Sequence, residues 1–287
     1  MPKKSSAKSS KSSASAATAS AFQPRKKQAT GREQSDVHVY GKGIVCDTET
    51  RGHARPQGRS ILEIIVDASE GFIPLWAKDQ TLRWKFRESS LKFFEKPAAA
   101  KTAIRKLLGE ALLAWGDAAP VKFAERNDVW DFEIIMRATD NCNAVGCVLA
   151  SAFFPDAGRH KLTLYPRMFT QDHQEQLETL VHEIGHAFGL RHFFAKIQEA
   201  QFASEIFGKH DAFSIMNYGP KSKLTDADKS DLKKLYQAAW KGELKEINGT
   251  PIKFMKPYHT AVGSPDNLVA MPAAPQPIPM AAFVTPG

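Results

Sequence analysis

The chain has 287 residues, of which 43% are hydrophobic and 24% are charged, a composition typical of a globular protein with one medium domain or two small ones. No run of about eighteen apolar residues occurs, which excludes a membrane-spanning helix. The formal net charge is +8, but residues 1–30 carry seven basic side chains and no acidic one. The remaining chain is therefore close to neutral, and no specific nucleic-acid-binding face is expected.

The two ends of the chain differ in composition from its middle. Residues 1–35 are rich in Ser, Ala and Lys and poor in large apolar side chains, which predicts a disordered basic tail. No apolar stretch follows the charged start, so no secretory signal peptide is visible. Residues 36–80 are predicted to be an N-terminal segment, either a pro-segment or an extension, with one strand in SILEIIVDA. Residues 241–287 predict a C-terminal extension whose last 25 residues contain six prolines.

Strand and helix signals alternate in residues 81–240. Residues 81–87, TLRWKFR, alternate apolar and basic side chains, which is the period of a half-buried strand. In residues 98–115 the apolar positions repeat at three and four, which predicts an amphipathic helix. Four more strands are predicted, in VKFAE (121–125), DFEIIMRA (131–138), CVLASAFF (147–154) and HKLTLYP (160–166).

Two helices complete the predicted order. The first is capped by Thr170 and ends at Gly189, and the second begins at Thr225. Both carry apolar side chains at helical spacing for a core. A strand, a helix, several strands and two further helices together predict an α+β fold.

The chain holds three cysteines, too few for a disulfide scaffold. Cys142 and Cys147 lie in the loop NCNAVGC, which closes as a disulfide only in an oxidising compartment and with Cα atoms within about 7 Å. The sequence favours neither state. The spacing does not match a zinc ribbon either, because no second cysteine pair follows.

The stretch VHEIGHAFGLRH, residues 181–192, places three histidines and a glutamate on an otherwise apolar helix. Side chains four residues apart on a helix project the same way, so His182 and His186 can share one metal ion. Gly189 tolerates the conformation in which the chain turns back, which makes His192 the third candidate ligand. Glu183 neighbours His182 but is rotated away, so it can reach a metal-bound water without displacing a ligand.

Two histidines at this spacing are, by themselves, more often incidental than ligands. Here the glutamate, the glycine and the third histidine each stand where the geometry requires them, so we interpret the stretch as a metal site. Three neutral imidazoles with a fourth position left for water are typical of catalytic zinc, whereas structural zinc sites are closed. One catalytic Zn²⁺ per chain is therefore expected.

These residues resemble a known family. HEIGHAFGLRH matches the zinc motif of the metzincin endopeptidases at every defining position, and FSIMNYG, residues 213–219, matches their Met-turn. GCVLASAFFPD and LTDADKSDLKKLY are most similar to the matrixin branch, and the resemblance covers about residues 82–236. It implies an α+β, metzincin-like twisted mixed sheet with an active-site helix and a C-terminal helix, and residues 81–240 would be the catalytic domain.

The resemblance also implies a role for each site residue. His182, His186 and His192 would bind the zinc, Glu183 would be the general base, and Met216 would pack beneath the metal. The chain would be an endopeptidase that hydrolyses protein substrates with a zinc-activated water, whose proton Glu183 passes to the leaving amine. We expect the substrate to lie extended along CVLASAFF, held by main-chain hydrogen bonds. A monomer is expected.

Two positions depart from the matrixin pattern. Ser151 stands where matrixins commonly have a histidine that binds a second, structural zinc, so that zinc is not expected. Tyr218 follows Met216 by two residues, as in astacins and serralysins, where this tyrosine can approach the metal. Tyr218 is thus a candidate catalytic residue that hydrogen-bonds the transition state, and the alternative is a packed core aromatic.

Three further questions stay open on the sequence. The alternative function is a zinc-bearing binding module without proteolytic activity, which a peptidase assay distinguishes. Cys46 or Asp47 in GIVCDTET can block the zinc as metzincin pro-segments do, but the matrixin switch sequence is absent and Cys46 also suits a buried strand. The resemblance implies an extracellular protease, although no export signal is visible.

Overall fold

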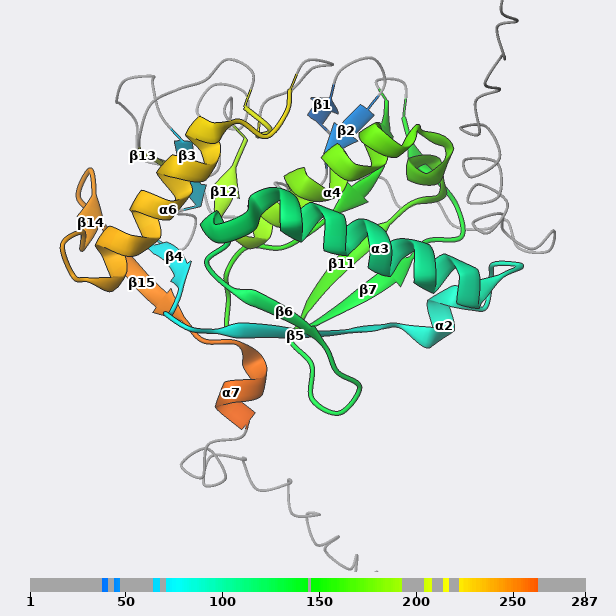
Figure 1. Ribbon diagram of the computed structural model, residues 1–287, viewed down its shortest axis with the longest axis horizontal. Helices are drawn as coiled ribbons and strands as arrows, with labels where there is room; N and C mark the ends of the chain where they lie inside the picture. Colours follow the sequence, from blue (N-terminus) through cyan, green and yellow to red (C-terminus); the bar gives the residue numbers. More distant parts are fainter. Residues whose placement is uncertain are drawn as a thin grey trace, which may run out of the picture.

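The computed structural model describes residues 38–40, 44–46, 64–67, 71–143, 146–192, 204–207, 214–216 and 222–262. Its centre is a five-stranded mixed sheet with two long helices packed on one face (Figure 1). The predicted α+β fold, with an active-site helix and a C-terminal helix around a mixed sheet, is confirmed. None of the helices in the described residues combines the length and the hydrophobicity that a membrane span requires.

The central sheet has the strand order β10-β11-β7-β5-β6, which makes β10 and β6 its edges. Neighbouring strands run parallel from β11 to β6, whereas β10 runs antiparallel to β11. The strands are β5 (Thr81–Phe86), β6 (Lys122–Glu125), β7 (Phe132–Met136), β10 (Ala150–Ser151) and β11 (His160–Leu164). Four of the strands predicted in residues 81–166 are thereby confirmed, with shorter ends.

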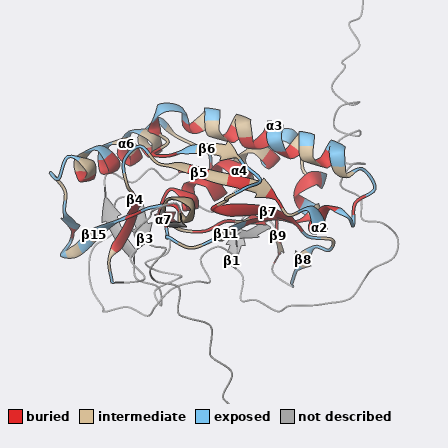
Figure 2. Ribbon diagram, turned by 90° about the horizontal axis from the view of Figure 1, so that it is seen from below, coloured by how far each residue is buried: buried red, intermediate tan, exposed pale blue. Residues whose placement is uncertain are grey.

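The long helix α3 (Pro97–Trp115) agrees with the helix predicted for residues 98–115. Its first residue is a proline, which the first helical turn tolerates because its missing N–H has no partner there anyway. The side of α3 that faces the sheet is buried and the opposite side is exposed (Figure 2). Short helices flank α3, namely α2 (Glu88–Leu91) before it and the 3₁₀ helix η2 (Gly116–Ala118) after it.

The second long helix, α4 (His173–Ala187), packs against α3 and carries the histidine motif. Asp172 caps it, because its carboxylate accepts a hydrogen bond from the Glu175 N–H at 2.9 Å. The prediction that Thr170 is the cap is wrong. Thr170 ends the 3₁₀ helix η3 (Pro166–Thr170), where its hydroxyl donates to the Arg167 carbonyl instead.

The single strand predicted for residues 147–154 is two strands in the structure. β9 (Cys147–Val148) pairs with β8 (Asn141–Cys142) and with β2 (Ile44–Cys46), while β10 joins the central sheet. The continuous apolar run has no period that reveals this break. Cys142 and Cys147 form a disulfide across the β8–β9 pair. β1 (His38–Tyr40) pairs with β2.

Segments before and after residues 81–240 contribute to the same core. β4 (Ile73–Trp76) pairs in parallel with β15 (Thr250–Met255), which also pairs with β14 (Glu246–Ile247). Trp76 is fully buried, and the Trp240 indole N–H donates to its carbonyl at 2.9 Å. The helix α7 (Tyr258–Val262) is attached to the sheet through His259, whose Nδ1 lies 2.8 Å from the buried Asp131. The division of the chain at residues 36, 81 and 241 stays a prediction.

Two further elements border the motif. The helix α6 (Asp226–Trp240) begins after Thr225 as predicted, with a capping box formed by Thr225 and Asp228. A three-stranded sheet has the order β12-β3-β13, with β3 (Ile64–Asp67) between β12 (Leu190–Arg191) and β13 (Ser204–Phe207). The strand predicted in SILEIIVDA is thus confirmed over its second half.

Candidate metal centre

Helix α4 buries polar side chains that an amphipathic helix normally exposes. His182, Glu183 and His186 have exposed fractions of 1%, 2% and 0%. Buried polar groups of this kind are costly unless each finds a hydrogen-bond partner or an ion. The partners of the histidines therefore indicate whether these side chains are structural or could bind a metal ion.

The ring nitrogens of the three predicted ligands converge on one point. Nε2 of His182 lies 3.0 Å from Nε2 of His186 and 3.0 Å from Nε2 of His192, which is also fully buried. Across the described residues, these three form the sole group of three or more His, Cys, Asp or Glu side chains that could hold a metal ion. The structure thus brings together the ligand set that the helix spacing and Gly189 predicted.

Backbone carbonyls determine which nitrogen of two rings carries the proton. Nδ1 of His182 lies 2.7 Å from the Ile215 carbonyl, and Nδ1 of His186 lies 2.8 Å from the Leu190 carbonyl. A carbonyl oxygen only accepts, so each Nδ1 must donate, which leaves the lone pair of each neutral ring on Nε2. The lone pairs therefore point into the cluster, as metal ligation requires.

The surroundings favour the neutral form of both rings. Burial lowers the pKa of His182 well below its ordinary 6.5, and the adjacent His192 lowers it further. Burial also lowers the pKa of His186, with contributions from His182 and His192. Neutral, converging imidazoles fit zinc, because nitrogen ligands at 2.0–2.1 Å in a tetrahedral arrangement lie about 3.3 Å from one another.

The turn after α4 delivers the third ring. Gly189 has φ +94°, and a Cβ at this residue would lie 3.3 Å from the Pro74 carbonyl, so both its conformation and its surroundings favour glycine. This turn is the one the sequence predicted. Arg191 follows it with no exposed surface, and its guanidinium lies 5.2 Å from the centre of the Phe154 ring. The Phe154 ring in turn meets His186 edge-on at 5.5 Å.

Met216 packs against the helix between the two ligands on α4. A Cβ added to Gly185 would lie 2.6 Å from the Met216 sulfur and 3.3 Å from the Trp115 ring. Met216 is 2% exposed, and the Trp115 indole N–H donates to the Val181 carbonyl at 3.0 Å. Glycine at position 185 is therefore required for the thioether to reach the helix. In the predicted Met-turn FSIMNYG, the structure describes Ser214, Ile215 and Met216; Tyr218 lies outside the described residues.

Asp228 holds this turn in place from α6. Its carboxylate accepts hydrogen bonds from the Ser214 hydroxyl at 2.6 Å and from the Thr225 N–H at 2.9 Å. The Ile215 N–H also points to it at 3.4 Å. Since the Ile215 carbonyl orients His182, Asp228 acts on a ligand through one intervening residue. The sequence predicted that a helix begins at Thr225, but it did not predict this contact of Asp228.

Aromatic side chains from far along the chain secure the end of α4. The Trp76 indole N–H donates to the Ala187 carbonyl at 2.7 Å, and the Tyr236 hydroxyl donates to the Phe188 carbonyl at 2.9 Å. Burial raises the pKa of Tyr236 above its ordinary value of 10.0. These donors satisfy carbonyls that have no partner within the helix. No local pattern in the sequence pointed to them.

The sequence matches a known protein family. A family model described as Matrixin matches residues 75–237. This range agrees with the predicted resemblance over about residues 82–236. No curated protein matches the sequence. Among solved structures, that of myroilysin aligns with 60% of this chain and 98% of its own, at 14% sequence identity and a TM-score of 0.40.

Proposed function

The chain belongs to the matrixin family of zinc metalloproteases, and on this premise we propose that it is an endopeptidase with one catalytic zinc held by His182, His186 and His192. The observation that carries the proposal is the convergence of three buried Nε2 atoms, with those of His186 and His192 each 3.0 Å from that of His182. When bound there, zinc supplies a Lewis acid that polarises the scissile carbonyl and lowers the pKa of a bound water to about 7.

Glu183 is proposed as the general base. It follows His182 on α4, so its side chain is rotated by about 100° from the direction that His182 and His186 share. A carboxylate at that angle is suited to take a proton from water and to hand it to the leaving amine, rather than to bind the metal. Its exposed fraction is only 2%, which keeps competing solvent away from the proton it carries.

The substrate is proposed to bind as an added strand along β10. In the described sheet β10 is an edge whose partner is β11, so its outer backbone groups suit an extended peptide. The neighbouring β9 differs, because β2 from the N-terminal segment pairs with it in parallel. The edge available to a substrate is therefore shorter than the predicted strand CVLASAFF and is centred on Ala150 and Ser151.

The proposal is tested on the purified full chain. Zinc content is measured together with hydrolysis of a denatured protein substrate, with and without chelator. Glu183→Ala should keep one zinc per chain and lose activity by about 10²- to 10⁴-fold, the usual contribution of a general base. His186→Ala should lose both zinc and activity. Glu175→Ala, an exposed glutamate in the first turn of the same helix, is the matched control and should retain both.

The outcomes separate the endopeptidase from its alternative, a zinc-bearing binding module. Zinc bound at one equivalent without any hydrolysis by the wild-type chain would favour the binding module. If Glu183→Ala hydrolysed the substrate at a nearly normal rate, or released zinc as readily as His186→Ala, Glu183 would not be the base. A wild-type chain that binds no zinc would refute both functions.

We further propose that the protein works in an oxidising compartment, in keeping with an extracellular protease. The disulfide between Cys142 and Cys147 supports this, because such bonds persist outside the reducing cytosol. Mass spectrometry of the alkylated protein, isolated from its natural source, tests it. Free thiols at both positions would contradict the proposal.

A further inference from the structure

The strand β12 is a short piece of chain on which two zinc ligands depend. It comprises Leu190 and Arg191, directly before His192. The Leu190 carbonyl also accepts the hydrogen bond from Nδ1 of His186 at 2.8 Å. A displacement of β12 would therefore misplace one proposed ligand and remove the group that orients another.

Leu190 and Arg191 are both fully buried, but the local backbone of β12 does little to hold its position. A strand of two residues has no stability of its own, and the glycine before it, with φ +94°, adds conformational freedom to the unfolded chain. Functional side chains nevertheless need to be held to about 0.5 Å. Backbone support for β12 therefore comes from a neighbouring strand.

That strand is β3, from the segment upstream of the predicted catalytic domain. Val66 stands opposite Leu190, and Ile65 stands opposite Arg191, in antiparallel register. On its other side β3 pairs with β13 over four residues, from Ser204 to Phe207. Among the described strands, β12 and β13 have no other partner in this sheet than β3, whose position in the order is central.

β3 is also fixed to the core that carries α4. Five residues separate its end at Asp67 from the start of β4 at Ile73, and Ile73 and Trp76 are fully buried. Trp76 donates its indole N–H to the Ala187 carbonyl at the end of α4. β3 and β4 thus contact residues on both sides of the Gly189 turn.

We propose that residues 64–67 are a positioning strand of the zinc site and that the N-terminal segment through Asp67 belongs to the catalytic unit. The inference rests on the proposed zinc-dependent function. It means that cleavage between Asp67 and β4 would inactivate the protein, in contrast to the removal of a latency segment, which would activate it. The catalytic unit then begins at or before Ile64 instead of at residue 81.

Two full-chain variants, Ile65→Pro and Val66→Pro, test the proposal. Successive N–H groups of a strand point to opposite neighbours, so one variant loses a donor toward β12 and the other toward β13. Both should bind Zn²⁺ at least about tenfold more weakly than the wild type, in competition with a chelator, as is usual when the supports of metal ligands are lost. Val39→Pro in β1, which pairs with β2, is the matched control and should bind zinc normally.

The outcomes distinguish this inference from the proposed function. Equal zinc affinity in the wild type and in both folded proline variants would overturn the positioning role alone. No zinc in the wild type would overturn the proposed function and the positioning role with it. If both variants lose the near-ultraviolet circular dichroism of the tryptophan core, amide hydrogen exchange of the metal-free wild type decides. Matched protection of residues 64–67 and 190–192 supports the inference, and fast exchange in 64–67 beside slow exchange in 190–192 refutes it.

Discussion

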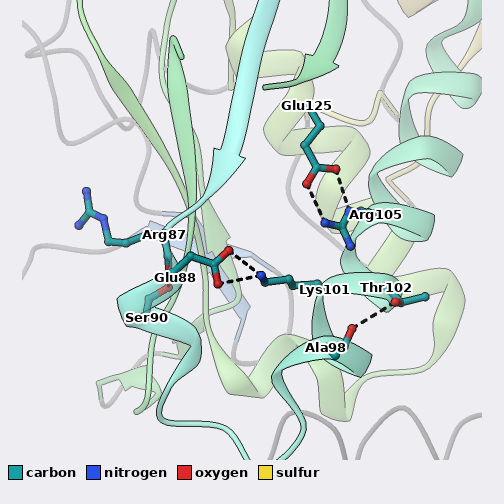
Figure 3. A network of polar contacts seen from close by, with 8 residues as sticks. All are labelled: Arg87, Glu88, Ser90, Ala98, Lys101, Thr102, Arg105 and Glu125. Carbon is teal, nitrogen blue, oxygen red and sulfur yellow. Dashed lines mark hydrogen bonds and ion pairs between the residues drawn. The ribbon is translucent and has the colours of Figure 1, made fainter. Parts of the chain in front are cut away.

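Helices α3 and α4 pack against each other and share one core, but α3 exposes its polar side chains whereas α4 buries several of them. On α3 the charged residues lie at the surface. Arg105 makes two hydrogen bonds of 2.7 Å with Glu125, and Lys101 contacts both carboxylate oxygens of Glu88 (Figure 3). On α4 the polar residues His182, Glu183 and His186 are buried. α3 thus has the usual amphipathic arrangement, whereas α4 buries the polar groups of the proposed zinc site.

The difference lies in what supports each helix. The ion pairs of α3 sit in water, where such pairs contribute little. The buried rings of α4 each have a specific partner on the backbone. Asp228 of α6 holds the turn that carries the Ile215 carbonyl, and β3 pairs with the strand that carries the Leu190 carbonyl. We therefore expect the protein to tolerate changes on the outer side of α3 and to respond strongly to changes around α4.

The largest expected effect is at Asp228, which supports the Met-turn from α6. Asp228→Ala removes the acceptor for Ser214 and Thr225 and should destabilise the fold by roughly 2–4 kcal/mol, because hydrogen bonds to charged groups are strong and the donors stay buried. Zinc affinity should fall as well. Urea unfolding and chelator competition measure the two effects. Asp226→Ala, exposed in the first turn of the same helix, is the control, and a similar loss there would remove the distinction.

A pair of glycine substitutions compares the two helices directly. Gly185→Ala on α4 would place a Cβ 2.6 Å from the Met216 sulfur, so it should cost about 1–3 kcal/mol through overpacking. Gly109→Ala on α3 meets nothing within 4 Å and should stabilise the protein by up to about 1 kcal/mol, since alanine is the better helix former. Thermal and urea unfolding of both variants give the sign of each change in the free energy of unfolding. The same sign for both would contradict the contrast.

Tyr236→Phe tests the support at the end of α4. The Phe188 carbonyl would lose its donor, and the backbone N–H of Trp76 would lose its acceptor, at a cost of about 1–2 kcal/mol. The tyrosine also predicts a pH effect. Because burial raises its pKa above 10.0, the native state keeps a proton that the unfolded chain releases, so stability should fall as the pH rises above that value.

The phenylalanine variant lacks this ionisation. The stability gap between wild type and Tyr236→Phe should therefore narrow from about pH 9 to about pH 11, measured by urea unfolding. A constant gap across this range would show that Tyr236 ionises in the native state as it does in the unfolded one.

The smallest effect is expected on the surface of α3. Arg105→Gln removes the paired contact with Glu125, which raises the pKa of Arg105, but both side chains are partly exposed. The loss should be at most about 1 kcal/mol and should shrink further in high salt. Chemical unfolding at low and high salt measures it. A cost as large as that of Asp228→Ala would show that the surface pairs of α3 matter as much as the buried network of α4.

The sequence alone determined the features that depend on near neighbours in the chain. The four-residue spacing brings His182 and His186 to one side of a helix, and Gly189 permits the turn that follows. The alternation in residues 81–87 and the start of α6 after Thr225 are equally local, and the structure agrees with each. Local patterns can still predict the wrong residue when two capping residues lie close together in the sequence. Asp172, not Thr170, caps α4.

Only the tertiary structure decided what surrounds the helix that carries the motif. The Tyr236 hydroxyl accepts a hydrogen bond from the backbone N–H of Trp76, 160 residues away in the sequence. Nδ1 of His182 lies next to the Ile215 carbonyl, 33 residues away. β3 reaches β12 from the segment that the sequence separated from the catalytic domain. Such long-range contacts produce no periodic pattern in the sequence, because any apolar strand or buried aromatic residue fits the same local pattern. Which of them meets the histidines depends on how the whole chain packs.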